Sequence, residues 1–342
     1  MEKSANMDVG GISGTKSEGP MDEGAGELKT DKALHALILA GNSRAYVPVG
    51  RRNKALIRIQ GRRLVEYVAE ALDRSELVKS ITVIGNEKRL SFLKSELSLQ
   101  KHLEVIPQRE NIVRNLLHGY DHILPAHDAP ILVATADIPL LTPGEITYFI
   151  ERSGYEDFDY VMGLASERAL EPFYPQGRKR GMRMSYLYFR QFAARINNLH
   201  IINPSIVKHP EYGGILYSLR YQKRIGNFLH MLKELFRKEV PTFELMKWGT
   251  MLEIALQCDR FGWYGKAHEI GRKIDLQEVE ALISRTLAIR YKTFCMDFGG
   301  AALDIDNRRD KTTMQRRFEE WRDLIAEGER EFLSTAKAKN FN

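Results

Sequence analysis

Short apolar runs alternate with stretches of helical periodicity over the first 150 residues of the chain. Each apolar run is closed by a glycine, a proline or an aspartate, and the runs are residues 36–40, 81–85, 103–106 and 129–136. The intervening stretches with apolar side chains at helical spacing are residues 64–72, 90–99 and 111–123. This alternation predicts an α/β fold with a mostly parallel sheet. Because such sheets bind ligands beyond the carboxyl ends of their strands, residues that follow the runs are the first candidates for a functional site.

The pattern is less regular in the second half of the chain. Residues 217–288 carry apolar side chains spaced for one helical face, which predicts amphipathic helices. Apolar runs at residues 160–164 and 292–296 predict two more strands, and residues 195–204 predict a strand that enters a turn. We expect residues of about 155–290 to form an acceptor-side and helical insertion, whose helical unit covers the sheet and shapes the acceptor pocket.

The two ends of the chain differ in character. Residues 1–32 are rich in Gly, Ser, Glu and Lys and predict a disordered acidic tail. A single large domain is expected over residues 33–310. Residues 311–342 predict a surface helix with a frayed tail, and its expected anchors are Phe318, Trp321, Leu324 and Ile325.

A loop with small and cationic residues follows the first apolar run. Gly41, Asn42 and Ser43 let the backbone approach a ligand closely and turn its amide groups outward. Arg44 and Lys54 add two cations within a dozen residues, so the loop favours a polyphosphate. The alternative is an ordinary glycine turn with solvated cations, as in many α/β domains. The loop has neither the Walker A spacing nor the dinucleotide-binding fingerprint.

An aspartate, Asp137, directly follows the apolar run at 129–136. A carboxylate beside a buried strand is unfavourable unless it meets water, a cation or hydrogen bonds. It would otherwise cap the next helix, but Thr142 is the better cap, with Pro143 at the first helical position and Glu145 completing a capping box. Asp137 is therefore left for a cation.

A second pair of carboxylates, Asp304 and Asp306, lies late in the chain. Side chains alternate in extended chain, so both carboxylates lie on one side, where a divalent cation would relieve their repulsion. The alternative is a solvated acidic turn balanced by Arg308 and Arg309.

These motifs together resemble the signature of the nucleotidyltransferases related to molybdenum-cofactor guanylyltransferase and of the sugar-phosphate nucleotidyltransferases. The matching positions, in order, are Leu39, Ala40, Gly41, Arg44, Lys54 and Gly61, then Asp137-Ile138-Pro139, then Asp304-Ile305-Asp306. The loop after Gly41 is shorter than usual in this family, and Arg308 stands where many relatives have proline.

The resemblance implies a three-layer, Rossmann-like fold of the GT-A type. It implies a reaction in which a phosphorylated small molecule attacks the α-phosphorus of a nucleoside triphosphate and pyrophosphate leaves. Arg44 and Lys54 would be the catalytic cations, and Mg²⁺ would be held by Asp137 and Asp306, with or without Asp304. The expected nucleotide-binding residues are Leu39, Ala40, Gly41, Asn42, Ser43, Gln108, Asn111 and Asn115.

The acceptor side of the site is less sharply indicated. The basic segment at 177–183 is either a solvated loop or a clamp for the acceptor's phosphate, because guanidinium groups match phosphate geometry. Arg183, Asn197 and Asn198 are the expected acceptor-binding residues. The sequence identifies neither the nucleotide nor the acceptor, and the oligomeric state is open.

Composition narrows the class of protein further. The 342 residues include 43% hydrophobic residues, no apolar run long enough to span a membrane, and two cysteines, Cys258 and Cys295, so we expect a cytoplasmic globular protein. Four lysines against seven carboxylates give residues 1–32 a net charge of −3, and the overall +6 then leaves +9 for the remainder. Such a surplus favours anionic ligands without choosing among them.

Three alternatives stay open from the sequence. The same sheet with an Asp-x-Asp motif suits a GT-A-type glycosyltransferase that uses a nucleotide-sugar, although such an enzyme does not need Arg44 and Lys54. The altered glycine loop would also suit a catalytically inactive nucleotide-binding relative. A nucleic-acid-binding or regulatory module would explain the basic excess, but we expect no nucleic-acid partner.

Overall fold

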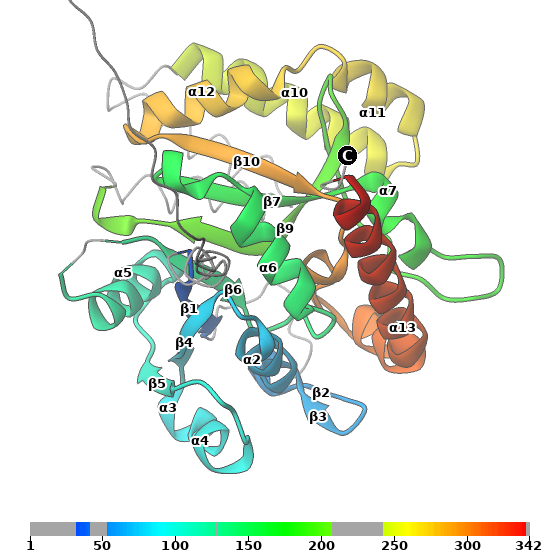
Figure 1. The fold of residues 1–342 in the computed structure, drawn as a ribbon. Helices are drawn as coiled ribbons and strands as arrows, with labels where there is room; N and C mark the ends of the chain where they lie inside the picture. Colours follow the sequence, from blue (N-terminus) through cyan, green and yellow to red (C-terminus); the bar gives the residue numbers. More distant parts are fainter. Residues whose placement is uncertain (1–31, 42–52, 127–128, 207–241, 340–342) are drawn as a thin grey trace, which may run out of the picture.

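The computed structural model describes residues 32–41, 53–126, 129–206 and 242–339, with side chains up to residue 330. An eight-stranded sheet crosses the molecule in the order β10-β7-β9-β6-β1-β4-β5, with β8 paired to β9 (Figure 1). The strands are β1 (Leu34–Ala40), β4 (Val78–Gly85), β5 (Leu103–Pro107), β6 (Ile131–Thr135), β7 (Tyr160–Ser166), β8 (Leu187–Tyr188), β9 (Ala193–Ile202) and β10 (Tyr291–Met296). The α/β fold with a mostly parallel sheet is confirmed.

One central strand runs against the others. β9 is antiparallel to both of its neighbours, β6 and β7, whereas β1, β4, β5 and β6 pair in parallel, as do β7 and β10. The sequence predicted β9 as a strand but not its direction. Consequently β9 begins at the edge of the sheet where its neighbours end, and this edge carries the candidate site.

Helices cover both faces of the sheet. Alternate residues of β1 divide between the faces: Ala36 and Ile38 pack into the cluster with α2 (Leu64–Arg74) and α6 (Pro143–Arg152), and Leu37 packs beside α5 (Ile112–Ile123). α12 (Leu276–Leu287) covers the α5 face near β7 and β10. These three layers follow from the continuously apolar strands, which are buried on both sides.

The helical segment of the second half gathers beyond β10. Figure 1 shows α10 (Thr242–Arg260) and α11 (Tyr264–Gly271) together with α12 at that edge of the molecule. α10 and α12 share an apolar cluster with β8, centred on Trp248 and Ile274. The part of the predicted amphipathic region at 217–241 lies outside the described residues.

Two local predictions need correction. Residues 90–99 do not form one helix but contribute to two short ones, α3 (Glu87–Leu90) and α4 (Phe92–Glu96). The C-terminal helix α13 (Arg308–Lys339) begins earlier than predicted. Of its expected anchors, Phe318, Trp321 and Ile325 are buried, whereas Leu324 is 38% exposed.

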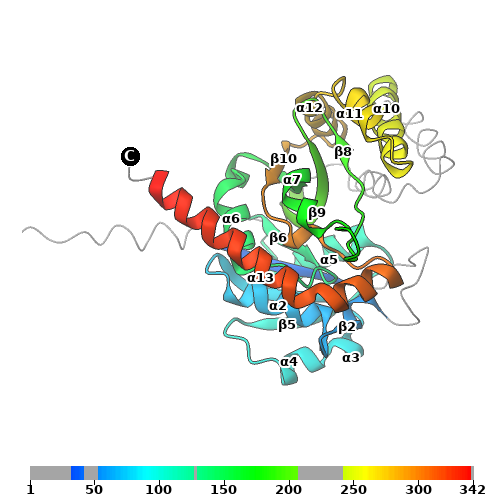
Figure 2. The same ribbon diagram turned by 90° about the vertical axis from the view of Figure 1, so that its right-hand side faces the viewer.

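α13 runs along one side of the molecule (Figure 2). Near its start, Gln315 accepts a hydrogen bond from the backbone amide of Gln60 at 3.2 Å, in the turn between β2 (Arg58–Ile59) and β3 (Arg62–Arg63). Near its far end, Glu329 accepts one from the amide of Glu145 at 3.0 Å. In the described part of the chain, no helix is both long enough and apolar enough to cross a membrane.

Candidate active site

Three carboxylates from distant parts of the sequence meet at the carboxyl edge of the sheet. Asp137 follows β6, and Asp304 and Asp306 follow the short 3-10 helix η5 (Gly300–Ala302). One oxygen of each of the three lies within 4.8 Å of the others. The backbone amide of Ile305, between the two late aspartates, donates to the carbonyl oxygen of Asp137 at 3.2 Å. This hydrogen bond fixes the late loop against the end of β6.

Lys54 lies among these carboxylates. Its Nζ is 2.6 Å from Oδ1 of Asp306 and 3.5 Å from Oδ2 of Asp137. The preceding residue, Asn53, is buried and sets the lysine's position: its Nδ2 donates to the carbonyl oxygen of Ala40 at 2.6 Å, and its Oδ1 accepts from the amide of Ala55 at 3.0 Å. The lysine is thereby tied to the end of β1.

Electrostatics keep the lysine charged. Burial by itself would lower the pKa of Lys54, but the carboxylates of Asp137 and Asp306 outweigh it and raise that pKa well above its ordinary value. Burial and the neighbouring Asp304 raise the pKa of Asp137, and Lys54 offsets only part of this shift. The cluster therefore holds more negative charge than its lysine neutralises.

The donor set suits a hard divalent cation. Carboxylate oxygens are the ligands that Mg²⁺ takes from proteins, usually one or two carboxylates completed by water and substrate oxygens. The side chain of Asp304 is 6% exposed and is paired with Arg195 at 2.7 Å, whereas those of Asp137 and Asp306 are 16% and 38% exposed. Asp137 and Asp306 thus have the more accessible oxygens, and these residues fit the ion.

Side chains from the sheet and from α6 hold the loop that carries the late aspartates. The carboxylate of Glu145 accepts from the amide of Ala301 at 2.9 and 3.1 Å. Nδ2 of Asn198 donates to the carbonyl oxygen of Ala301 at 2.9 Å, and Nε of Arg195 donates to that of Ala302 at 3.1 Å. The aspartates are therefore positioned by contacts that reach across the molecule.

The expected capping box at the start of α6 is wrong in its second half. Thr142 caps the helix, since its hydroxyl oxygen accepts from the amide of Glu145 at 3.2 Å. The side chain of Glu145, however, turns to Ala301, and Glu329 of α13 accepts from the Thr142 hydroxyl. Sequence spacing cannot distinguish these two partners for a glutamate at this position.

The predicted nucleotide-binding residues lie at the neighbouring strand ends. A Cβ on Gly41 would lie 3.1 Å from Nδ2 of Asn115 and 3.5 Å from Oε1 of Gln108. A side chain here would push the Asn115 amide away by a few tenths of an ångström, so glycine lets both amide side chains lie close to the end of β1. Asn111 caps α5 by accepting from the amide of Arg114 at 2.9 Å.

The other predicted site residues fall into two groups. Leu39 and Ala40 form the end of β1, while Asn42, Ser43 and Arg44 lie outside the described residues. Of the expected acceptor-binding residues, Arg183 is exposed and Asn197 and Asn198 are buried. The acceptor-binding role of these three stays a prediction.

Three residues of the site were not singled out by sequence reasoning. They are Asn53, which fixes Lys54; Arg195, which pairs with Asp304; and Glu145 in its contact with Ala301. Asn53 had a signal, because it stands directly before the lysine of the signature. The other two depend on which strand lies beside which, and one sequence does not reveal this.

Comparison with known proteins gives a family match for part of the chain and several similar folds. Residues 36–195 match the family of MobA-like NTP transferase domains. No curated protein sequence is significantly similar to the chain. A hypothetical transferase from Thermus thermophilus has a similar structure, with a TM-score of 0.55 and 21% identity, over 82% of this chain and 99% of that one. A 4-diphosphocytidyl-2C-methyl-D-erythritol synthase from Anaerococcus prevotii DSM 20548 gives a TM-score of 0.47 and 9% identity, over 85% of this chain and 99% of that one.

At these identities the Thermus structure shows a shared fold, and the assignment depends on the family match. That match begins in β1 and ends at Arg195 in β9, so it includes Lys54 and Asp137 and stops before Asp304. Residues 36–195, just under half of the chain, therefore carry the similarity to MobA-like NTP transferase domains, and this match supports a nucleotidyltransferase enzyme.

Proposed function

We propose that this chain transfers a nucleotidyl group from a nucleoside triphosphate to a phosphorylated small molecule, with Mg²⁺ and with release of pyrophosphate. The observation that carries the proposal is the position of Lys54 Nζ, 2.6 Å from Asp306 and 3.5 Å from Asp137 at the carboxyl edge of the sheet. One cation and three carboxylates around a single point suit a metal-bound polyphosphate.

The chemistry requires alignment and neutralisation more than covalent help. An oxygen of the acceptor's phosphate would form a bond to the α-phosphorus, and the bond from that phosphorus to the bridging oxygen of pyrophosphate would break. The attacking phosphate is already anionic, so no general base is needed. Lys54 would stabilise the negative charge that accumulates at the α-phosphate.

Mg²⁺, when bound by Asp137 and Asp306, would neutralise phosphate charge and help to orient the triphosphate. Gly41, Gln108 and Asn115 lie together at the next strand ends and would contact the nucleotide. Arg44 would hold the outer phosphates, as the family resemblance implies.

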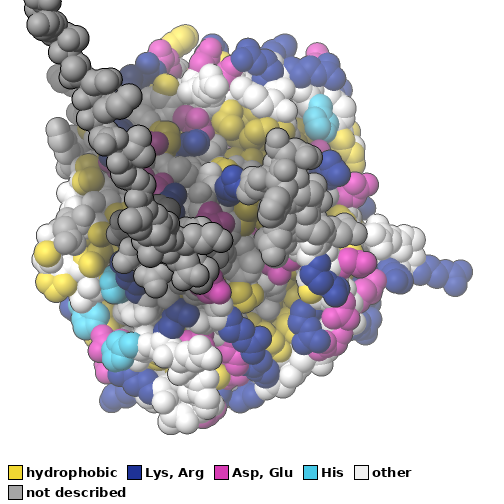
Figure 3. Space-filling view, viewed as in Figure 1, with side chains coloured by type: hydrophobic (Ala, Val, Ile, Leu, Met, Phe, Trp, Pro, Cys, Tyr) yellow, Lys and Arg dark blue, Asp and Glu magenta, His cyan; other side chains and the backbone are white. Residues whose placement is uncertain are grey.

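The alternatives make different demands on the site. A glycosyltransferase that uses a nucleotide-sugar has no evident need for a lysine between the aspartates. A nucleic-acid-binding module would favour a broad surface of one charge. Figure 3 instead shows basic and acidic side chains interspersed over the visible described surface, in keeping with ion pairs such as those of Arg63 with Glu66 and Glu96.

A pyrophosphate-release assay tests the proposal. Each nucleoside triphosphate is offered with Mg²⁺ to a panel of sugar, polyol and alcohol phosphates. Lys54→Ala and Asp137→Ala should each lower turnover by at least about 10²-fold, because each removes a preorganised charge at the reacting phosphate or its metal. Lys88→Ala, which alters an exposed lysine on α3, is the matched control.

Two results would overturn the proposal. One is equal pyrophosphate release by wild type, Lys54→Ala and Asp137→Ala. The other is turnover of nucleotide-sugars without any turnover of triphosphates, which would establish the glycosyltransferase alternative.

A further inference from the structure

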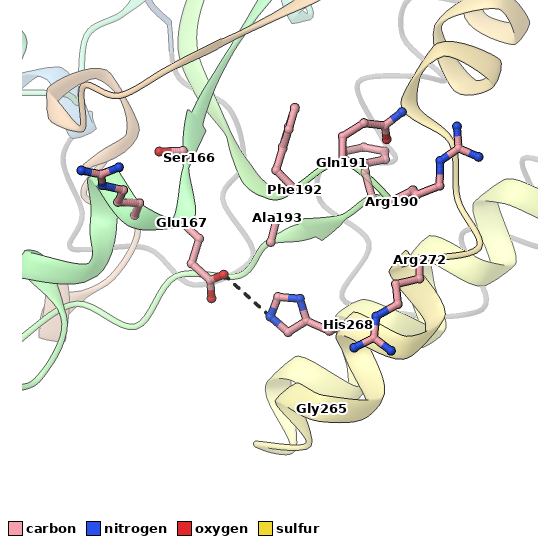
Figure 4. Close-up of a pocket in the computed structure, with 11 residues that line it drawn as sticks. Ser166, Glu167, Arg190, Gln191, Phe192, Ala193, Gly265, His268 and Arg272 are labelled. Atoms are coloured by element: carbon pink, nitrogen blue, oxygen red, sulfur yellow. Dashed lines mark ion pairs between the residues drawn. The ribbon is translucent and has the colours of Figure 1, made fainter.

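A cavity of about 620 Å³ opens between the end of β7, the β8–β9 hairpin and α11 (Figure 4). Its volume lies in the usual range for a small-molecule site. Ser166 and α7 (Glu167–Leu170) supply one wall, Ala193 and the preceding turn the second, and α11 the third. The α11 wall lies outside the part of the chain that matches the transferase family. The cavity is therefore lined partly by residues that lie outside the matched segment.

The cavity lies close to the candidate active site. Ala193 and Arg195 are two residues apart on one face of β9, which separates them by about 7 Å. The guanidinium of Arg195 reaches Asp304 at 2.7 Å. One arginine side chain and two strand residues thus connect the cavity wall to the aspartates.

The charges around the cavity favour an anion. Arg168, Arg190 and Arg272 line it, and Glu167 is the one carboxylate among the described residues that line it. Arg190 is paired with Asp275, and Glu167 is 3.7 Å from His268, as the dashed line in Figure 4 marks. Arg168 and Arg272 form no ion pair with any other described residue. Their guanidinium groups are therefore available to bind a phosphate or a carboxylate.

The arrangement of α11 strengthens this interpretation. His268 and Arg272 are four residues apart, the spacing that places two side chains on one helical face, and Figure 4 shows them projecting from the same side of that segment. Phe192 contributes an apolar surface to the opposite wall. Arg168 of α7 and Arg272 at the end of α11 thus line the same cavity from different walls.

We propose that this cavity binds an oxyanion group, a phosphate or a carboxylate, carried by the acceptor at the end away from its reacting phosphate. This proposal rests on the proposed function only where it identifies the ligand as the acceptor. The charge and position of the cavity do not depend on the proposed function. The substrate class that follows is a small metabolite with anionic groups at both ends.

Calorimetric titration of the full chain with three hexose derivatives tests this proposal. Glucose 6-phosphate has one anionic end, 6-phosphogluconate adds a carboxylate, and glucose 1,6-bisphosphate adds a second phosphate. Wild type should bind at least one of the two-ended probes about 10-fold more tightly than glucose 6-phosphate, because charge-assisted hydrogen bonds at the second end add affinity. The preferred probe also distinguishes a carboxylate site from a phosphate site.

Arg272→Ala and Arg168→Ala should each reduce this preference to about 3-fold or less and leave the affinity for glucose 6-phosphate unchanged. Lys273→Ala is the matched control, since Lys273 is the next residue, is exposed, and does not line the cavity. The preference should also weaken between low and high salt, as expected for exposed charges.

The outcomes separate this proposal from the proposed function. Equal affinity of wild type for all three probes, or no binding of any, overturns the cavity proposal even if pyrophosphate release depends on Lys54. A two-ended preference that depends on Arg272, in a protein whose pyrophosphate release is insensitive to Lys54→Ala, supports the oxyanion site and overturns the proposed function.

Discussion

Lys54 is the residue on which the charge balance of the site depends. Its ammonium offers three hydrogen-bond donors and contacts the carboxylates of Asp306 and Asp137. In this position it supplies positive charge that a metal ion would otherwise supply, and it can pair with the negative charge of a phosphate. The two carboxylates raise the pKa of Lys54 despite its burial, so it remains a cation throughout the physiological pH range.

Removing this lysine should make stability depend more strongly on Mg²⁺. Lys54→Ala leaves Asp137, Asp304 and Asp306 facing one another without the ammonium, so the melting temperature without metal should fall. A divalent cation relieves the same repulsion, so Mg²⁺ should raise the melting temperature of Lys54→Ala by more than that of wild type. Thermal unfolding with EDTA and with Mg²⁺ measures both values. An equal Mg²⁺ shift in Lys54→Ala, wild type and Asp137→Ala would contradict a metal site among these carboxylates.

Glu145 is the second residue with an unusual environment. It is fully buried in α6 and its carboxylate accepts from the amide of Ala301. Burial raises the pKa of Glu145 from 4.5 to about 8, with Glu329 nearby acting in the same direction and the Ala301 amide opposing it. The folded protein therefore binds a proton at Glu145 that the unfolded chain has lost between these two pH values.

The free energy of unfolding should consequently fall as the pH rises from about 4.5 through about 8, by at most about 1.4 kcal/mol per pH unit for this group. Glu145→Gln removes the titration and keeps an oxygen for the Ala301 amide, so its stability should depend less on pH. Urea unfolding at pH 6 and pH 9 measures the difference. Glu151→Gln, at an exposed position of the same helix, should behave like wild type. Parallel pH profiles for wild type and Glu145→Gln would show that the buried carboxyl does not titrate as stated.

At the scale of elements, the loop from Gly299 to Asp306 connects the sheet to the chemistry. Side chains of α6 and β9 hold its backbone, and the amide of Ile305 binds the end of β6. The loop is tightly packed at Gly300, where an added Cβ would lie 2.3 Å from the carbonyl oxygen of Leu140. Backbone must move to relieve such a contact.

Gly300→Ala should therefore displace both late aspartates without changing any charged group. We expect pyrophosphate release to fall at least about 10-fold and the protein to lose about 1–3 kcal/mol of stability, as for other overpacked sites. The assay with Mg²⁺ titration and urea unfolding give the two values. Gly328→Ala is the control, because nothing lies within 4 Å of its added Cβ and alanine favours a helix. Full activity of Gly300→Ala at ordinary Mg²⁺ concentrations would contradict this prediction, because it would show that the loop accommodates the added methyl group without displacing the aspartates.

Elements of this fold could be predicted to different degrees. The ends of β1, β4 and β6 were predictable because continuous apolar runs stop at Gly41, Gly85 and Asp137. The antiparallel direction of β9 was not, because the pattern of side chains along a strand does not depend on the direction of its neighbours. The contact of Glu145 with Ala301 was missed for a related reason: local spacing favours the capping box, and only tertiary packing overrides it.

At the scale of the whole molecule, the site is assembled from segments that are far apart in the sequence. Family motifs could predict that Lys54 and the three aspartates belong together, but not the scaffold that brings the late loop back to β6. α13 is part of that scaffold. Its Phe318 and Trp321 pack in one apolar cluster with Ile59 beside η1 (Lys54–Leu56) and with Phe173. One helix therefore braces the lysine segment and follows directly after the aspartate loop.

Because Trp321 belongs to this cluster, its substitution tests how much the packing of α13 contributes to stability. The side chain is fully buried and lies edge-on to Phe173, with ring centroids 5.4 Å apart. Trp321→Ala should lower the free energy of unfolding by about 3–5 kcal/mol, the usual effect of removing a large buried aromatic side chain. Urea unfolding followed by circular dichroism measures this loss.

Trp321→Phe is the matched variant. The indole Nε1 makes no hydrogen bond to any described residue, so the substitution removes side-chain volume only and should lower the free energy of unfolding clearly less than Trp321→Ala. A loss below about 1 kcal/mol for Trp321→Ala would contradict the tight packing of α13 against the domain, and with it the role of this helix in holding Lys54 near Asp306.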